Sequence, residues 1–347
     1  MNVDYIIVGC GLAGISFCEQ LKANQKSFVV FDNQSQLSSA VAGGLYNPVI
    51  LKRFTSVWKS KEQLQMALPM YANLEKELHI KLDYQVPVLR RFTSLEEQNN
   101  WFIASDKPKL SEYLSTKLIK NENRAIDAPF GFGEVLHTGR IDMQRLMHAY
   151  KNNLTSKQQL VEEAFQYDMV KINTNTFQYK NIESKHIVFA EGFGVKRNPF
   201  FKDVPLKPSK GELVTIHAAD LKINYILKSS VFLFPLGDHL YRVGATYEWE
   251  DQTNAITIKG KEELLDKLKT FITCPFEVVD QVAGIRPTVI DRRPLVGEHH
   301  KIKNMFVLNG LGTRGVMIGP YVANKLYNFI EKDELLEKEI DINRFTP

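Results

Sequence analysis

Apolar residues at the start of the chain predict a strand, a helix and a second strand in close succession. Residues 5–8 are a short apolar run closed by glycine, which is typical of a buried parallel strand. Apolar side chains then recur at every third position, which predicts a helix with one buried stripe. The stripe consists of Leu12, Ile15, Cys18 and Leu21. A second apolar run at residues 28–31 ends at Asp32, so the chain opens with a β-α-β unit.

Three glycines between the first strand and the helix have the spacing of a dinucleotide-binding turn. Gly9, Gly11 and Gly14 form G-x-G-x-x-G. The first allows a tight turn, the second lets a pyrophosphate approach the backbone, and the third lets the helix pack closely on the strand. Asp32 follows Gly14 by 18 residues, close to the roughly 20 expected of an acid that binds the ribose. We therefore predict that the N-terminal unit binds a dinucleotide, with phosphates at the helix N-terminus.

The rest of the chain alternates between helical and strand patterns and predicts two interleaved domains. Helices are expected over residues 58–78, 142–154, 259–273 and 316–330. Strands are expected over residues 84–92, 186–190 and 304–310, and within 213–247. The predicted class is α/β (α+β overall), with a Rossmann-like nucleotide-binding domain and a substrate-binding domain on a mixed or antiparallel β-sheet. The first domain would comprise residues 1–80, 139–196 and 281–347, and the second residues 81–138 and 197–280.

Composition is that of an ordinary globular protein and narrows the function only a little. The 347 residues are 44% apolar and 24% charged, and the net charge of +4 permits an anionic substrate without requiring a nucleic acid. Three cysteines without metal spacing are expected to be reduced packing residues, and no metal site is predicted from the histidines. No signal peptide and no apolar run long enough to span a membrane are visible. We expect a soluble, cytoplasmic protein with no membrane partner.

Arg286 is the most unusual candidate for binding chemistry. It lies between apolar residues and a proline, so its side chain is held on an apolar segment rather than on a solvated face. A buried guanidinium requires an anion. The residues leave open whether that anion is a carboxylate of the protein or a substrate carboxylate bound bidentately.

Two further segments are rich in small residues. Residues 38–48 follow Asp32 closely, and their glycines would let the backbone run against a large flat ligand; a flexible loop is the alternative. Residues 310–315 form a second glycine-rich turn between a strand and a helix, and this turn also contains Thr313 and Arg314. Simple packing between helix and strand is the alternative for this turn.

The order of these motifs resembles the D-amino-acid oxidase (DAO) family of FAD-dependent oxidoreductases over residues 4 to about 330. The resemblance rests on the first glycine motif, Gly43-Gly44, Ala190-Glu191-Gly192, residues 243–247, the Gly-Ile-Arg-Pro sequence at 284–287 and the final glycine turn. Within the family the chain is most similar to glycine oxidase. Its C-terminal turn also resembles the FAD-dependent half of the bifunctional enzyme that modifies carboxymethylaminomethyl-uridine in tRNA.

The resemblance implies that FAD is the cofactor, and noncovalent binding is expected because no cysteine lies in the segment where some relatives attach flavin. Gly9, Gly11 and Gly14 would hold the pyrophosphate, Asp32 the ribose, and residues 39–44 would lie along the flavin. The C-terminal turn would direct backbone N–H groups at the flavin pyrimidine, where negative charge develops. The implied cofactor-binding residues are Gly9, Gly11, Leu12, Ala13, Gly14, Asp32, Asn33, Ser39, Ala40, Gly43, Gly44, Ala190, Gly192, Gly310, Gly312, Thr313, Arg314, Gly315 and Val316.

The implied reaction is oxidation of the C–N bond of a small carboxylate-bearing amine or amino acid. Hydride passes to the flavin, and water hydrolyses the resulting imine. Arg286 would bind the substrate carboxylate, and Arg314 would lie near the flavin or the substrate entrance; both are candidate catalytic residues. Phenylalanines occupy the strand at 231–235, where glycine oxidase has a tyrosine that helps to hold the carboxylate. This departure counts against a substrate as small as glycine.

Three other functions remain open from the sequence. One is an FAD-dependent oxidoreductase that removes a carboxymethyl group from a modified uridine of tRNA. For this function the basic pairs at residues 52–53, 90–91 and 292–293 would form a tRNA-binding rim rather than solvated faces. The others are a non-catalytic flavoprotein and an NAD-dependent dehydrogenase. The oligomeric state and the electron acceptor are not predicted.

Overall fold

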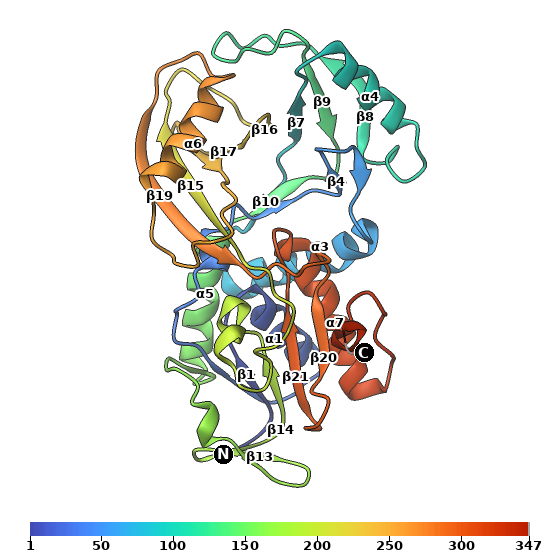
Figure 1. Ribbon diagram of the computed structural model, residues 1–347, viewed down its shortest axis with the longest axis vertical. Coiled ribbons are helices and arrows are strands. Elements are labelled where there is room, and N and C mark those ends of the chain that lie inside the picture. Colours follow the sequence, from blue (N-terminus) through green and yellow to red (C-terminus); the bar gives the residue numbers. More distant parts are fainter. Residues whose placement is uncertain (346–347) are drawn as a thin grey trace.

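The computed structural model describes residues 1–345, which form two parts that lie one above the other (Figure 1). The lower part contains the N-terminus and a sheet covered by helices. The upper part is built on a second large sheet. Within residues 1–345, no helix combines the length and the apolar character needed to cross a membrane.

The lower sheet contains a central group of parallel strands in the order β11-β2-β1-β14-β21, with antiparallel strands at its margins. The parallel strands are β1 (Asn2–Val8), β2 (Phe28–Phe31), β11 (Leu160–Val161), β14 (Ile182–Phe189) and β21 (Met305–Asn309). The marginal strands are β12 (Lys171–Ile172), β13 (Phe177–Tyr179) and β20 (Leu295–Glu298). β1 and β2 are almost wholly buried because helices and loops cover both faces of the sheet.

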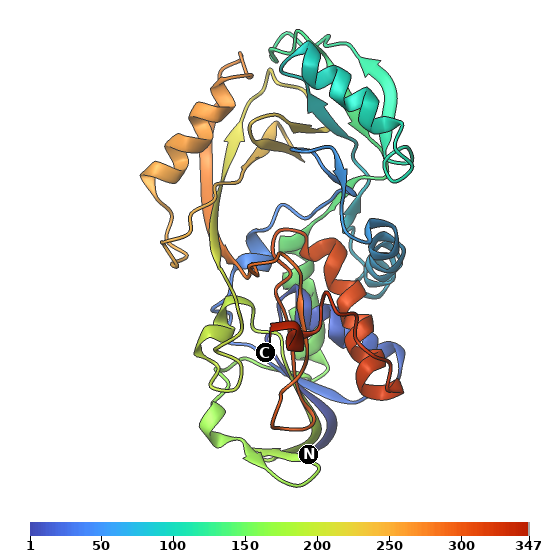
Figure 2. The ribbon, with the colours of Figure 1, turned by 45° about the vertical axis from the view of Figure 1, so that its right-hand side comes forward.

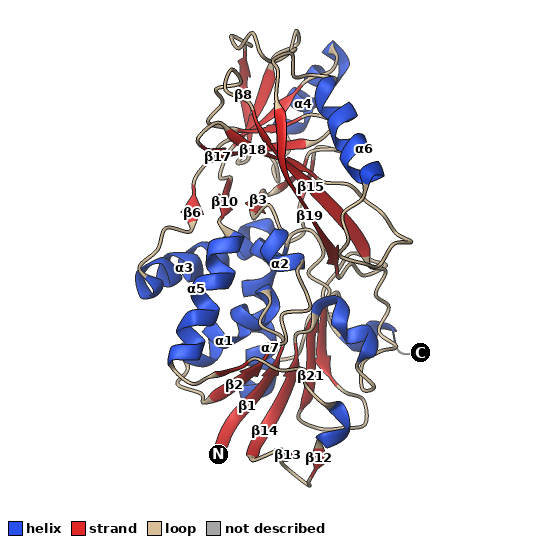
Figure 3. Ribbon diagram, turned by 90° about the vertical axis from the view of Figure 1, so that its left-hand side faces the viewer, coloured by secondary structure: helices blue, strands red, loops and turns tan. Residues whose placement is uncertain are grey.

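Four helices cover one face of this sheet, as Figure 3 shows. They are α1 (Leu12–Ala23), α3 (Ser60–Leu78), α5 (Met143–Ser156) and α7 (Gly315–Lys332). Their apolar stripes form one continuous core with β1 and β2, in which Tyr71, Leu146 and Leu326 are fully buried. The other face is covered by an aromatic cluster around Phe165 and Phe189, near the short helices η1 (Tyr167–Met169), η2 (Gly192–Arg197) and η3 (Ile342–Phe345).

The upper sheet has eight strands in the order β19-β15-β18-β17-β16-β7-β9-β8, all antiparallel except the pair β16–β7. It curves around the space above the lower part, with α6 (Ile258–Lys269) and α4 (Leu95–Ser105) on its outer side (Figure 2). Its strands are β7 (Val88–Arg91), β8 (Leu114–Ile119), β9 (Phe132–Val135), β15 (Ser209–His217), β16 (Ile226–Lys228), β17 (Phe232–Gly237), β18 (Leu240–Gly244) and β19 (Glu277–Arg286). Short strands join the two parts: β3 (Leu45–Tyr46), β10 (Gly139–Ile141) and β6 (Asp83–Tyr84) pair as one small sheet, and β4 (Val49–Ile50) and β5 (Thr55–Ser56) as another.

The predicted α/β class, with a Rossmann-like sheet and a second mixed sheet, is confirmed. Each predicted helix is present within a few residues, but the strand expected at 84–92 is divided between β6 and β7. The predicted boundary at residue 281 falls inside β19, which pairs with β15 along its whole length, from Glu277 to Arg286. Arg286 therefore belongs to the upper sheet, at the end that meets the lower part.

Candidate functional site

A cavity of about 1700 Å³ lies between the two parts, well above the roughly 300–1,000 Å³ typical of a small-molecule site. Its floor is the carboxyl edge of the parallel sheet, where ligands of this kind of fold bind. Every predicted cofactor-binding residue lines the cavity except Gly14 and Gly310. Arg286 lines it as well, so residues from positions 9 to 316 are brought to one site.

In the first glycine motif Gly9 and Gly14 are required by the local backbone or packing, whereas Gly11 has open space beside it. Gly9 has a φ of +103°, and a Cβ on Gly14 would lie only 2.0 Å from the Gly9 carbonyl oxygen. Gly14 is therefore required for the close packing of helix on turn. A Cβ on Gly11 would meet only the Ser39 hydroxyl, at 3.2 Å, and Gly11 lines the cavity. Gly11, the position predicted to let a phosphate approach the backbone, is thus the glycine of the motif with free space where a side chain would be.

Asp32 lies at the end of β2 with its carboxylate directed at the glycine turn. One oxygen accepts a hydrogen bond from the backbone N–H of Cys10 at 2.6 Å, and the other from the Nζ of Lys151 at 3.0 Å. The neighbouring Asn33 is exposed and lines the cavity. Lys151 was not predicted, because it lies in α5 and no local motif connects it to an acid 119 residues away.

The segment after Asp32 places a hydroxyl at the N-terminus of α1. Ser39, in the short helix α2 (Ser38–Val41), accepts a hydrogen bond from the backbone N–H of Leu12 at 3.0 Å. Gly43 faces Phe234 of the upper sheet, whose ring would lie 3.1 Å from an added Cβ. Gly44 has a structural role: a Cβ there would lie 1.9 Å from the Ile141 carbonyl oxygen, where β3 pairs with β10. This segment is therefore a wall of the cavity that touches both parts.

The second glycine turn lies opposite this wall. Gly310 and Gly312 have φ values of +75° and +59°, and the turn leads into α7 at Gly315. A Cβ on Gly315 would lie 2.9 Å from the Leu12 side chain, so this glycine lets α7 pack against α1. The side-chain amide of Asn309, which was not predicted, donates to the Gly192 carbonyl at 2.8 Å. The helix N-termini of α1 and α7 thus lie side by side, both with residues on the cavity.

These residues fit a flavin dinucleotide. The open face at Gly11 and the N-terminal N–H groups of α1 other than that of Leu12, which donates to Ser39, suit a diphosphate. The carboxylate of Asp32 can accept hydrogen bonds from ribose hydroxyls. The N-terminus of α7 offers N–H groups to a ring that gains negative charge on reduction.

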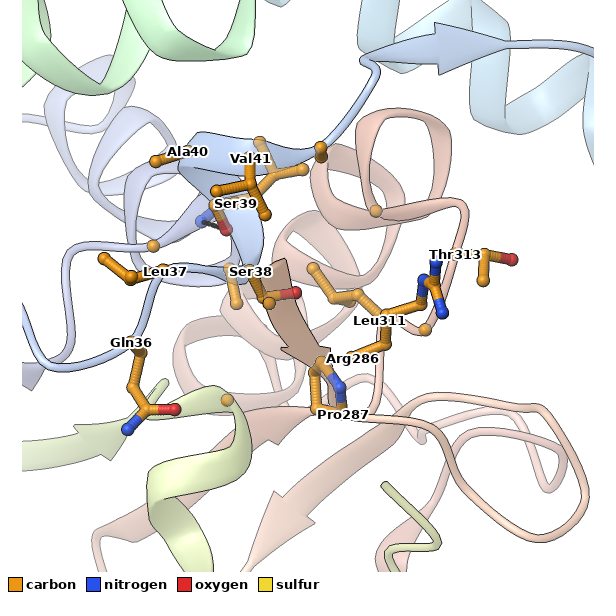
Figure 4. Close-up of a pocket in the computed structure, with 18 of the residues that line it drawn as sticks. Gln36, Leu37, Ser38, Ser39, Ala40, Val41, Arg286, Pro287, Leu311 and Thr313 are labelled. Atoms are coloured by element: carbon orange, nitrogen blue, oxygen red, sulfur yellow. Dashed lines mark hydrogen bonds between the residues drawn. The ribbon is translucent and has the colours of Figure 1, made fainter. Parts of the chain in front are cut away.

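Arg286 lies between α2 and the turn that contains Leu311 and Thr313 (Figure 4). Its guanidinium covers the Gly211 backbone, where a Cβ would lie 1.8 Å from Nη2. It donates to the carbonyl oxygen of Thr246 at 3.2 Å, and its Cζ lies 4.6 Å from the centre of the Tyr247 ring. Burial lowers the pKa of the guanidinium below its usual range.

No carboxylate within residues 1–345 forms an ion pair with Arg286. Of the two anions that the sequence left open, the protein carboxylate is therefore not found among the described residues. A buried cation that touches only neutral groups is costly unless an anion joins it. The guanidinium lies at the side of the cavity against the Tyr247 ring, which is 58% exposed.

The predicted basic pairs divide into two kinds. Arg90 is paired with Glu97 at 2.5 Å and Arg91 with Asp127 at 3.0 Å, so these side chains form ion pairs within the upper part. The other two pairs line the cavity, as does Arg314, and none of these five side chains forms an ion pair within residues 1–345. They are Lys52, Arg53, Arg292, Arg293 and Arg314.

Lys228 is a cavity residue that sequence analysis missed. It follows the buried residues of β16, its Nζ lies 4.5 Å from the centre of the Phe232 ring, and no carboxylate within residues 1–345 pairs with it. Burial, with Arg90 and Lys267 nearby, lowers its pKa to about 8. Only the depth of the position in the folded cavity distinguishes it from the many exposed lysines.

We expect Lys228→Met to stabilise the protein at neutral pH. The folded state holds the pKa at about 8 instead of 10.5, so the charged form opposes folding by up to about 3 kcal/mol, and solvent reduces this to about 1–2 kcal/mol. Between pH 8 and pH 10.5, Lys228 keeps its proton in the unfolded chain but loses it in the folded protein. The unfolding free energy of the wild type therefore rises with pH over this range, and the extra stability of Lys228→Met disappears. Urea unfolding at pH 7 and pH 10 measures both effects. Lys109→Met at an exposed site is the control, and a variant less stable than wild type at pH 7 contradicts the interpretation.

Fold and site together define an α/β protein of the nucleotide-binding kind, with a guanidinium that has no ion-pair partner among the described residues on the same cavity. The family model described as DAO, FAD-dependent oxidoreductase, matches residues 4–327. The chain therefore belongs to the DAO family of FAD-dependent oxidoreductases, and FAD is its cofactor, as predicted.

Individual relatives are distant. The chain is 26% identical over 152 residues to the tRNA 5-methylaminomethyl-2-thiouridine biosynthesis bifunctional protein MnmC of Nitrosospira multiformis. The matched region covers 40% of this chain and 24% of that protein. The chain is 25% identical over 162 residues to glycine oxidase of Bacillus subtilis, and this matched region covers 45% of this chain and 43% of that protein. The matched regions thus span less than half of these relatives. The crystal structure of glycine oxidase from Geobacillus kaustophilus superposes with a TM-score of 0.79 at 19% identity, covering 96% of each chain, and shows the same fold.

Proposed function

We propose that this protein oxidises the C–N bond of a small amine or amino acid that carries a carboxylate. The observation that supports the proposal most directly is Arg286, a half-buried guanidinium on the cavity with no carboxylate partner among the described residues. Relatives that include a glycine oxidase are consistent with an amine substrate.

In this proposal the residues of the chain bind and orient the substrate. Arg286 holds the carboxylate, and its own position is fixed by the Thr246 carbonyl and the Tyr247 ring. Phe232 and Phe234, which stack at 5.7 Å on the wall opposite Gly43, exclude water from the apolar part of the substrate. The bound flavin supplies the chemistry as the acceptor of a hydride from the carbon next to the nitrogen, and water hydrolyses the released imine.

Anaerobic titration of the FAD-loaded protein tests this function. We expect N-methylglycine or a related carboxylated amine to bleach the flavin absorbance, whereas the same amine without its carboxylate should require at least 100-fold more, because Arg286 then remains unpaired. A flavin that no carboxylated amine bleaches would instead indicate a non-catalytic flavoprotein. Bleaching only by carboxymethylaminomethyl-modified tRNA would favour the tRNA-modifying alternative.

A further inference from the structure

Three more arginines line the cavity that contains Arg286, so it holds more positive charge than one carboxylate requires. Arg292, Arg293 and Arg314, here called the rim arginines, line the same cavity. Burial lowers the pKa of Arg314, and the other two lie close enough to lower it further. Tyr247 covers Arg286 and also acts on Arg314, so this ring links Arg286 to Arg314, and Arg314 in turn lies close to Arg292 and Arg293.

The protein provides no counter-charge for the rim arginines within residues 1–345. The nearest acid in sequence, Asp291, is paired with Arg344 at 2.8 Å. The acidic residues that line the cavity all belong to the lower part, and the most buried of them have other partners: Asp32 has Lys151, and Glu191 has Asn198. The acids of the cavity therefore lie at the nucleotide end, and none of them neutralises the rim arginines.

Packing does not account for this arrangement. Arg293 does lie on an aromatic surface, with its Cζ 5.1 Å from the centre of the Trp58 ring, and such a contact holds the side chain without neutralising it. Arg292 has a φ of +60° in a turn closed by a hydrogen bond from its N–H to the Val289 carbonyl at 2.9 Å. Like charges held together in this way repel each other, and they are tolerated where an anion occupies the space between them.

The distribution of charge favours a small anion over a nucleic acid. A nucleic-acid footprint needs several free cations spread across an outer face. Here Arg90 and Arg91 on the upper part are bound by Glu97 and Asp127, whereas Arg286 and the rim arginines, which form no ion pair within residues 1–345, all line the cavity. Forked guanidinium groups match the geometry of carboxylates, which they bind with two parallel hydrogen bonds.

We propose that the substrate is a small amine with two anionic groups, one bound by Arg286 and the other by the rim arginines. This proposal rests on the proposed function and narrows its substrate to amines that carry a second carboxylate or a phosphonate. An amine with a single carboxylate would fill only one of the two positions.

The test measures binding of two ligands that cannot be oxidised at a C–N bond. Thiodiacetate has two carboxymethyl arms on sulfur, and (methylthio)acetate has one. We expect the FAD-loaded protein to bind thiodiacetate about 10- to 100-fold more tightly, read from the flavin absorbance and from the fluorescence of Trp58 beneath Arg293. The ratio should fall towards one in Arg292→Ala/Arg293→Ala. It should persist in Lys120→Ala/Arg124→Ala, which removes the same charge from exposed positions remote from the cavity.

The outcomes separate this proposal from the proposed function. Equal affinities for the two ligands in the wild type, or a preference that survives in Arg292→Ala/Arg293→Ala, overturn the second anion position whatever the enzyme oxidises. Tight, salt-sensitive binding of unmodified tRNA that displaces thiodiacetate also overturns it, because the rim arginines would then contact RNA. If thiodiacetate is preferred as expected while no carboxylated amine bleaches the flavin, only the proposed oxidation fails. Replacing the second carboxymethyl arm with phosphonomethyl distinguishes the two kinds of anion.

Discussion

Arg286→Ala is expected to reduce kcat/KM for a carboxylated amine by about 10²- to 10³-fold. The estimate corresponds to the roughly 2–5 kcal/mol lost when one member of a buried, hydrogen-bonded charge pair is removed. The protein offers no nearby replacement on β15 or β19, because the groups around the guanidinium are the Gly211 backbone, carbonyl oxygens and the Tyr247 ring. Steady-state rates together with FAD content per chain measure the effect.

Two control variants show whether the loss comes from the guanidinium itself. Arg286→Lys retains the charge without the fork, so part of the activity should remain. Gly211→Ala retains Arg286 but places a Cβ 1.8 Å from its Nη2, so the guanidinium must move and activity should fall as well. An amine without a carboxylate should react equally slowly with Arg286→Ala and with the wild type. Unchanged kcat/KM for the carboxylated amine in Arg286→Ala would remove the basis of the substrate assignment.

The local parts of the fold could be predicted because their patterns lie within short segments. The β1–turn–α1–β2 unit occupies residues 2–31, so apolar period and glycine spacing were sufficient to define it. The same holds for β21, the glycine turn and α7. The boundary inside β19 could not be placed, because the pairing of Arg286 with Ser209 depends on a strand 77 residues away.

The residues that sequence analysis missed share one property: their role arises from contacts between distant segments. Lys151 meets Asp32 only after α5 packs beside α2, and Asn309 meets Gly192 only across the edge of the parallel sheet. Arg286 was recognised from its apolar surroundings in sequence, but whether a protein carboxylate met it depended on the fold. Whether the rim arginines have acidic partners also depends on the fold, since two adjacent basic residues give the same sequence pattern whether they contact an acid or line a cavity.

The glycines of the first motif should separate into two classes by their effect on folding and on FAD binding. Gly14→Ala forces a Cβ to within 2.0 Å of the Gly9 carbonyl oxygen, a backbone atom that cannot move without shifting α1 or the turn. We expect the FAD-free protein to lose about 3 kcal/mol of unfolding free energy, the upper part of the range for overpacking. This is a large fraction of the stability of a typical domain, so poor recovery of folded protein is the expected result.

Gly11→Ala tests the cofactor without this damage. Gly11 has an extended backbone, with φ −81° and ψ −171°, that alanine adopts equally well, and its Cβ would meet only the hydroxyl of Ser39. The stability of the FAD-free protein should stay within about 1 kcal/mol of wild type. FAD affinity should fall by about 10- to 100-fold, since a methyl group would occupy the space that lets a pyrophosphate approach the N-terminus of α1. Urea unfolding and titration of flavin fluorescence measure the two quantities separately. If Gly11→Ala binds FAD as wild type does, the diphosphate does not lie at the open face of Gly11, and the two glycines differ only in how tightly the protein packs around them.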